Sequence, residues 1–179
     1  MARCYSGPVP RKKPLPQIWL LSDARSDAGL DAALRKLPRG SGLVFRHYHL
    51  GESQRHARFD AAARLARARG HVVALAGSKR QARRWGADLA YGPGGDLVPA
   101  HSLREIGRAQ RALALVLSPV FPTRSHPGAP GLGPLRFRLL AARALVPVIA
   151  LGGMNARSAR RLNWLRWAGI DAFAGAEQR

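Results

Sequence analysis

The amino-acid sequence predicts an α/β protein, a compact (β/α)8 TIM-type barrel in which one or two outer helices are missing. Three observations lead to this fold class. Short apolar runs alternate with longer amphipathic stretches, which is the order expected of a parallel sheet covered by helices. Several runs are apolar at every position, as in strands buried on both faces. Eight such runs can be distinguished, and eight parallel strands make a closed barrel.

The expected strands and helices follow one another along the chain. The strands are expected at residues 17–22, 42–46, 71–76, 87–91, 97–100, 112–118, 146–151 and 170–174. The stretches between them repeat apolar residues at the spacing of one helix face, which predicts helices at residues 27–37, 53–69, 79–85, 102–110, 134–144 and 155–167. Ser102 and Glu105 have the spacing of a capping box, and Pro134 fits the first turn of a helix. Trp164 and Trp167 are interpreted as packing residues of the last helix.

Two connections are too short to hold an outer helix. Residues 92–96 separate the fourth and fifth strands, and only residues 175–179 follow the eighth. A full barrel takes about 250 residues, so this one must be pared down. The alternative is an open doubly wound sheet, because the spacing of strands does not by itself distinguish an open sheet from a closed barrel.

The composition indicates one domain with a strong positive charge. The chain has 179 residues, of which 46% are hydrophobic, enough to bury a substantial core. No apolar run approaches the ~20 residues of a transmembrane helix, the first residues lack the apolar centre of a secretory signal, and Cys4 is the single cysteine. We therefore expect a cytoplasmic protein that does not enter a membrane. Residues 1–16 are expected to be a flexible basic segment, and residues 17–179 a single domain.

The charge limits the classes of partner. Lys and Arg number 30 against 10 Asp and Glu, a net charge of +20. The cations are spread along the whole chain, whereas nucleic-acid modules usually concentrate them on one element, so we do not expect specific nucleic-acid binding. Arginine recognises phosphate with two aligned donors, so a phosphorylated small-molecule substrate suits the composition. The sequence leaves a homo-oligomer open.

Glycine and proline gather in three segments that follow expected strands. These segments are residues 92–96, 118–133 and 152–153. Ligand-binding loops of α/β barrels lie at the carboxyl ends of the strands, where these segments are expected. The pair Gly152–Gly153 stands between a strand and a helix. It either lets backbone N–H groups converge on an anion or simply forms a tight turn.

Two of these segments resemble a known family. Ser118-Pro-Val-Phe-Pro-Thr-Arg-Ser-His-Pro-Gly128, followed by Leu132-Gly133 and Val146-Pro-Val-Ile-Ala-Leu-Gly-Gly153, is similar in order and spacing to thiamine-phosphate synthase and its relative, the thiazole tautomerase. Weaker similarity extends over about residues 17–176. The resemblance implies a (β/α)8 barrel with its site at the carboxyl ends of the strands. It also implies an enzyme of thiamine biosynthesis, which joins hydroxymethylpyrimidine pyrophosphate to thiazole phosphate and releases pyrophosphate.

The resemblance assigns roles to individual residues. The family's phosphate-binding stretch falls on Thr123, Ser125 and His126, the last of which stands where the family has lysine. The candidate substrate-binding residues are Ser118, Thr123, Ser125, Gly152 and Gly153, and the candidate catalytic residues are Arg46 and His126.

Other positions depart from the family pattern. The family's Gln-x-Arg-x-Lys strand is represented by Val44, Arg46 and Tyr48, which lie on one face of a strand, so only the arginine remains to neutralise pyrophosphate. Gly77 replaces one of the two carboxylates that bind Mg²⁺, and the other falls on Asp96. Mg²⁺ is therefore expected with a single carboxylate ligand. Asp96 is alternatively an ordinary turn residue.

Three alternatives to the synthase stay open. The first is a thiazole tautomerase-like enzyme, which keeps the phosphate loop without the pyrophosphate groups and needs a proton shuttle, for which His126 is the candidate in the loop. The second is a degenerate, non-catalytic barrel that binds a phosphorylated ligand. The third, suggested by charge alone, is a basic nucleic-acid-associated protein.

Other histidines have simpler interpretations. His47 and His49 have a spacing that suits metal ligands on a strand, but no third ligand is near, which favours a structural or surface role. His101, Ser102 and Glu105 could form a nucleophile set, although the capping box explains Ser102 and Glu105 better.

Overall fold

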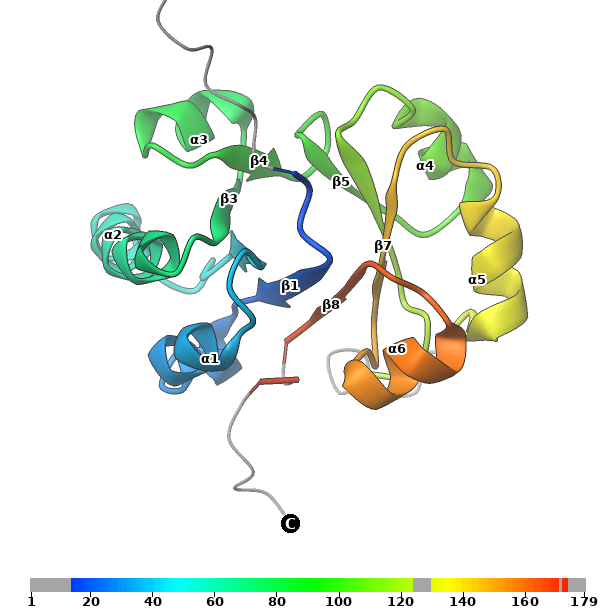
Figure 1. Cartoon of the computed structure of the whole chain (residues 1–179). Helices are drawn as coiled ribbons and strands as arrows, with labels where there is room; N and C mark the ends of the chain where they lie inside the picture. The colour runs from blue at the N-terminus through cyan, green and yellow to red at the C-terminus, as the bar shows by residue number, and fades with distance from the viewer. Residues whose placement is uncertain (1–13, 124–129, 171, 174–179) are drawn as a thin grey trace, which may run out of the picture.

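The computed structural model describes residues 14–123, 130–170 and 172–173, and these form one closed barrel of eight parallel strands (Figure 1). β1 pairs with both β2 and β8, which closes the ring. The predicted (β/α)8 barrel is confirmed, and the open sheet is excluded. The strands are β1 (Ile18–Leu21), β2 (Gly42–Phe45), β3 (Val72–Ala76), β4 (Leu89–Tyr91), β5 (Leu97–Ala100), β6 (Ala114–Leu117), β7 (Val148–Leu151) and β8 (Trp167–Gly169).

Six α-helices cover the outside of the barrel in the described residues (Figure 1). No helix stands between β4 and β5, and none follows β8 as far as the chain is described, in line with the predicted loss of outer helices. Every helix in the described ranges is too short or too polar to cross a bilayer. The helices are α1 (Leu30–Lys36), α2 (Glu52–Ala68), α3 (Lys79–Arg84), α4 (Leu103–Arg108), α5 (Gly133–Ala141) and α6 (Ala156–Leu162), with a 3-10 turn, η1, at Ala24–Ser26.

A tight loop replaces the helix between β4 and β5. The N–H of Gly92 donates to the carbonyl of Leu97 (3.0 Å), and the N–H of Asp96 donates to the carbonyl of Ala90 (2.8 Å). The loop therefore folds back beside β4 and starts β5 parallel to it. A Cβ at Gly95 would lie 2.7 Å from the carbonyl oxygen of Ala90, so this return requires glycine.

The last helix and strand differ from the prediction. α6 ends at Leu162, because its C-cap Asn163 is left-handed (φ 49°, ψ 55°), and the eighth strand is residues 167–169 instead of 170–174. Trp164 and Trp167 therefore do not lie on the last helix. A mixed apolar run suits a helix face and a strand alike. Here the strand forms because it can pair with β1 on one side and β7 on the other.

The core has two layers. Side chains such as Trp19, Val44 and Ile149 fill the inside of the barrel, and two further clusters lie between the strands and the helices. The indole N–H of Trp19 donates to the carbonyl of Pro16 (3.0 Å) at the amino end of the strands. The interior is thus packed with side chains, and ligand-sized space is left to the two ends of the barrel.

Candidate functional site at the carboxyl ends of the strands

The segments that follow β6 and β7 lie directly against each other. The N–H of Val120 donates to the carbonyl of Leu151 (2.8 Å), and the N–H of Phe121 donates to the carbonyl of Gly152 (3.0 Å). These bonds continue the pairing of β6 with β7 beyond the sheet. The two segments that carry the family resemblance therefore meet at one edge of the barrel mouth.

Both glycines of the pair are needed for this contact. Gly152 has φ 96°, and a Cβ there would lie 2.7 Å from Pro119 Cα; Gly153 has φ 62°, and a Cβ there would lie 2.7 Å from Phe121 Cβ. Residues that carry a side chain rarely adopt such positive backbone φ angles. The close approach of the two loops thus explains glycine at these positions, beside the two roles that the sequence leaves open, an anion-binding turn and a simple tight turn.

Thr123 contributes a buried polar atom to this edge. Its Oγ1 is buried and makes no hydrogen bond within the described part of the chain. Leaving a buried hydroxyl unpaired costs about 1–3 kcal/mol. A ligand oxygen at this place would remove that cost. Ser125 and His126, which the sequence also assigns to the phosphate loop, lie outside the described residues.

His101 and Ser118 form a second polar group, at the ends of β5 and β6. His101 Nδ1 lies 2.8 Å from the carbonyl oxygen of Ser118 and 3.3 Å from its Oγ. A carbonyl oxygen only accepts, so Nδ1 carries a proton, and Nε2 is the ring nitrogen left to exchange a proton. Sequence reasoning missed this role. The sequence signal for this role is the position of His101 directly after an expected strand, where the functional residues of a barrel lie.

The helix cap predicted at Ser102 forms, but the return bond from Glu105 reaches the N–H of His101 instead of that of Ser102, so the capping box is only half present. Ser102 Oγ accepts the N–H of Glu105 (3.3 Å), and Glu105 Oε2 accepts the N–H of His101 (2.5 Å). The hydrogen bond from His101 lowers the pKa of the Glu105 carboxyl below its ordinary value. The cap fixes the backbone on one side of His101, and the Ser118 carbonyl fixes its ring.

Arg46 lies across the mouth from this group. It follows β2, whereas Ser118 follows β6, and these strands are four places apart in the ring of eight. Arg46 Nε donates to the carbonyl of Ser22 (2.9 Å), and its Nη2 lies 3.2 Å from Asp23 Oδ2. A pocket of about 440 Å³ opens here, lined by Asp23, Arg25, Arg46 and Tyr48 among others. The expected pyrophosphate residue is therefore already paired with a carboxylate.

Asp23 is charged at neutral pH. Burial raises the pKa of Asp23, but the hydrogen bond from Arg25 and the charges of Arg25 and Arg46 outweigh it, so the pKa lies below its ordinary value. A second anion approaching Arg46 would meet this carboxylate, which weakens the attraction.

His47 has the structural role that the sequence favours. It is fully buried and stacks on Phe45 with ring centroids 4.4 Å apart. Its Nδ1 lies 2.9 Å from Ser22 Oγ, and its Nε2 lies 3.0 Å from Asp27 Oδ1. Burial lowers the pKa of His47 despite the nearby carboxylate, so the ring is neutral. It joins the ends of β1 and β2 at the wall of the pocket.

The arrangement of Asp96 does not fit Mg²⁺. Its Oδ2 accepts the N–H of Ala90 (2.9 Å), and its Oδ1 lies 3.1 Å from Lys79 Nζ. Both oxygens thus have partners, and Gly77 supplies no second carboxylate. No three His, Cys, Asp or Glu side chains gather into a metal-binding group in the ranges that the structure covers. Asp96 serves here as the turn residue that the sequence offers as its other role.

The fold and its loops together define a class: an α/β barrel whose polar and glycine-rich segments converge at the carboxyl ends of the strands. Within that class, residues 98–177 match the thiamine monophosphate synthase family. This part of the chain runs from the second residue of β5 through β8 and includes both segments that meet at the mouth. The resemblance predicted from residues 118–153 is thereby confirmed.

Solved structures extend the likeness in fold to nearly the whole chain. A thiamine phosphate pyrophosphorylase from Pyrococcus furiosus has a TM-score of 0.74 and 21% sequence identity, over 90% of this chain and 88% of that one. A structure described as native KDPGal has a TM-score of 0.58 and 16% identity, over 93% and 88% of the two chains. A cube-shaped, porous protein cage, designed by fusing symmetric oligomeric domains, has a TM-score of 0.58 and 17% identity, over 92% and 66%. No curated protein matches by sequence.

Proposed function

We propose that the protein acts on thiazole phosphate, which it binds at the ends of β6 and β7. The observation that carries this proposal is the contact of residues 118–123 with Gly152 and Gly153. This contact brings to the same edge the buried hydroxyl of Thr123, which has no hydrogen-bond partner among the described residues. A phosphate oxygen is a strong acceptor for that hydroxyl. Thiazole phosphate is the ligand that the family resemblance implies for this loop pair.

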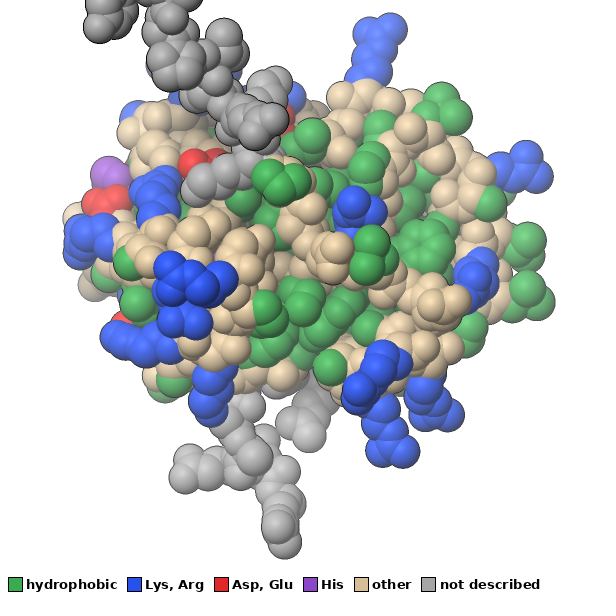
Figure 2. Space-filling model, viewed as in Figure 1, with side chains coloured by type: hydrophobic (Ala, Val, Ile, Leu, Met, Phe, Trp, Pro, Cys, Tyr) green, Lys and Arg blue, Asp and Glu red, His purple; other side chains and the backbone are tan. Residues whose placement is uncertain are grey.

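The charge of this half of the chain supports an anionic ligand. Between residues 106 and 170 the sequence has ten arginines and no aspartate or glutamate. The positive potential is therefore not cancelled by neighbouring carboxylates, and it attracts anions to this side of the barrel. Figure 2 shows arginine and lysine side chains distributed over the face at the amino end of the strands, so the potential is not confined to the mouth.

Replacing Thr123 with valine should weaken the binding of thiazole phosphate about tenfold. The change keeps the shape and removes one hydrogen bond to a charged acceptor, about 1.5 kcal/mol. Titration calorimetry measures the affinity. Thr123→Ser is the matched control, because it keeps the hydroxyl and should bind as the natural protein does. If the unphosphorylated thiazole alcohol binds as tightly as its phosphate, the phosphate site is wrongly assigned.

Two reactions of thiazole phosphate fit the site differently. The joining reaction of the synthase needs the pyrimidine pyrophosphate as a second substrate, which would have to bind in the pocket beside Arg46, across the mouth from the proposed phosphate site. In that reaction the thiazole nitrogen forms a bond to the pyrimidine methylene carbon while pyrophosphate leaves. Asp23 and the pairing of Asp96 with Lys79 leave this side of the mouth poorly suited to pyrophosphate.

An isomerisation of the thiazole ring is the second candidate, and His101 favours it. Moving a proton between ring positions needs a group that both accepts and donates a proton. His101 has its Nδ1 held by the Ser118 carbonyl and its Nε2 available as base. The residue stands one strand away from the proposed phosphate loop.

A His101→Gln variant separates the two reactions. If the protein isomerises thiazole phosphate, the rate should fall about 100-fold, the lower end of what a general acid–base group contributes, while affinity for thiazole phosphate stays unchanged. Both quantities are measured with the purified protein, by product analysis and by calorimetry. An isomerisation rate that does not change would remove His101 from the mechanism. Formation of thiamine phosphate by the variant, at the natural rate, would identify the joining reaction instead.

A further inference from the structure

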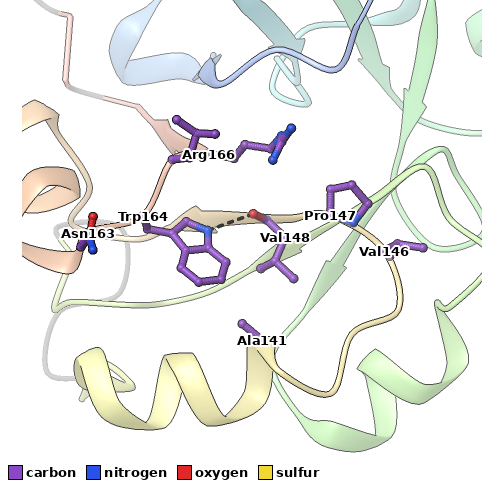
Figure 3. Close-up of a pocket in the computed structure, with 8 residues that line it drawn as sticks. Ala141, Val146, Pro147, Val148, Asn163, Trp164 and Arg166 are labelled. Atoms are coloured by element: carbon purple, nitrogen blue, oxygen red, sulfur yellow. Dashed lines mark hydrogen bonds between the residues drawn. The ribbon is translucent and has the colours of Figure 1, made fainter.

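A second pocket, of about 430 Å³, opens at the opposite end of the barrel from the candidate site (Figure 3). It lies where β7 and β8 begin, whereas the candidate site lies where the strands end. Its walls come from Ala141 at the end of α5, from residues 146–148, and from residues 163–166 between α6 and β8. The proposed function gives no role to the residues that line this pocket.

One wall of this pocket is a fixed aromatic side chain. The Trp164 indole packs edge-on against Phe137, with ring centroids 5.0 Å apart and an interplanar angle of 85°. Its Nε1 donates to the carbonyl of Val148 (3.0 Å), the bond drawn in Figure 3. Because both contacts hold the indole, the wall is already ordered before any ligand arrives, which lowers the entropic cost of binding. Val146 and Pro147 add apolar surface beside it.

The cationic group of the pocket is Arg166. Its Nε is buried and has no hydrogen-bond acceptor within the described residues. Figure 3 shows its side chain extending toward Pro147. The walls at residues 141, 146–148 and 163–166 contain no carboxylate, since the chain has none between residues 106 and 170. A buried donor without an acceptor is costly, and nothing in these walls relieves that cost.

We propose that this pocket binds a small monocarboxylate with an aromatic or branched apolar body. The Nε edge of a guanidinium offers two parallel N–H donors, which match the two oxygens of a carboxylate. A single arginine balances a single negative charge, and the apolar walls take the body of the ligand. Asn163, at the rim, can donate a further hydrogen bond.

The probe for this site is 3-phenylpropionate, titrated into the full-length protein. The indole N–H signal of Trp164 in a ¹H–¹⁵N spectrum reports binding at the pocket itself. We expect a saturable shift of this signal with 3-phenylpropionate, and an affinity at least tenfold weaker for the neutral 3-phenylpropionamide. The amide comparison uses the unaltered protein, so it does not depend on whether a variant folds.

Arg166→Gln should weaken the binding of 3-phenylpropionate at least tenfold. Arg161→Gln, an exposed arginine on α6 outside the pocket, is the matched control and should leave the affinity unchanged. The proposal is overturned if the Trp164 signal does not saturate at 3-phenylpropionate concentrations up to about 10 mM, because binding that weak is not specific. It is equally overturned if the amide binds as tightly as the acid, or if Arg166→Gln binds as the natural protein does.

Discussion

Replacing Gly152 with alanine should lower the free energy of unfolding by about 3 kcal/mol. Two costs combine. A residue with a side chain at φ 96° is strained by about 1–2 kcal/mol. Its Cβ would also lie 2.7 Å from both Cα and Cβ of Pro119 and 3.0 Å from the N of Val120, and forcing such contacts apart costs about 1–3 kcal/mol. Equilibrium unfolding in urea measures the sum.

Gly86→Ala separates the two costs. Gly86 also has a positive φ, 69°, but a Cβ there meets nothing within 4 Å. Its replacement should cost about 1–2 kcal/mol, the strain alone. If Gly152→Ala is no more destabilising than Gly86→Ala, residues 118–120 do not pack on the glycine pair as described. The site at the ends of β6 and β7 would then lose its main support.

The barrel could be predicted from the sequence because its signal is repeated along the whole chain. Seven of the eight strands fall within the predicted apolar runs, since a strand buried on both faces leaves an unbroken run. The eighth strand lies at Trp167–Gly169, before the apolar run at 170–174 that predicts it. The end of α6 depends on the left-handed conformation of Asn163. The position of β8 depends on its hydrogen bonding to β1, at the other end of the chain. Neither is visible in a local pattern.

The candidate site was predictable only where a motif carried it. The spacing of residues 118–153 placed two loops at one edge, and the structure brings them together. The partners of Arg46 and Asp96 could not be foreseen. Arg46 bonds to the carbonyl of Ser22, 24 residues away, and Asp96 bonds to a backbone N–H of Ala90. A residue type indicates what a side chain can bind, but the fold decides which backbone group reaches it first.

Loss of the Arg55 side chain should strongly disturb the side of the barrel mouth that the ends of β2 and β3 form. It is nearly buried on α2 and lies between the rings of Tyr48 and Trp85, with its Cζ 5.2 Å and 5.3 Å from their centroids. Its Nε donates to the carbonyl of Arg46 (2.8 Å), and its Nη2 donates to the carbonyl of Ala76 (2.6 Å). One guanidinium thus joins the ends of β2 and β3, which no shorter or single-donor side chain can do.

Arg55→Met should lower the free energy of unfolding by about 3 kcal/mol, because it keeps most of the packing volume but leaves two carbonyls without their charged donor, at about 1.5 kcal/mol each. Arg64→Met, on the exposed side of the same helix, should change stability by less than about 0.5 kcal/mol. Urea unfolding measures both.

Since Arg55 bonds to the backbone of Arg46, its loss should also loosen the pocket beside Arg46 while the affinity for thiazole phosphate at β6 and β7 stays the same. An equal loss of affinity at both sides would mean that the mouth behaves as one unit, and that the division into two halves is incorrect.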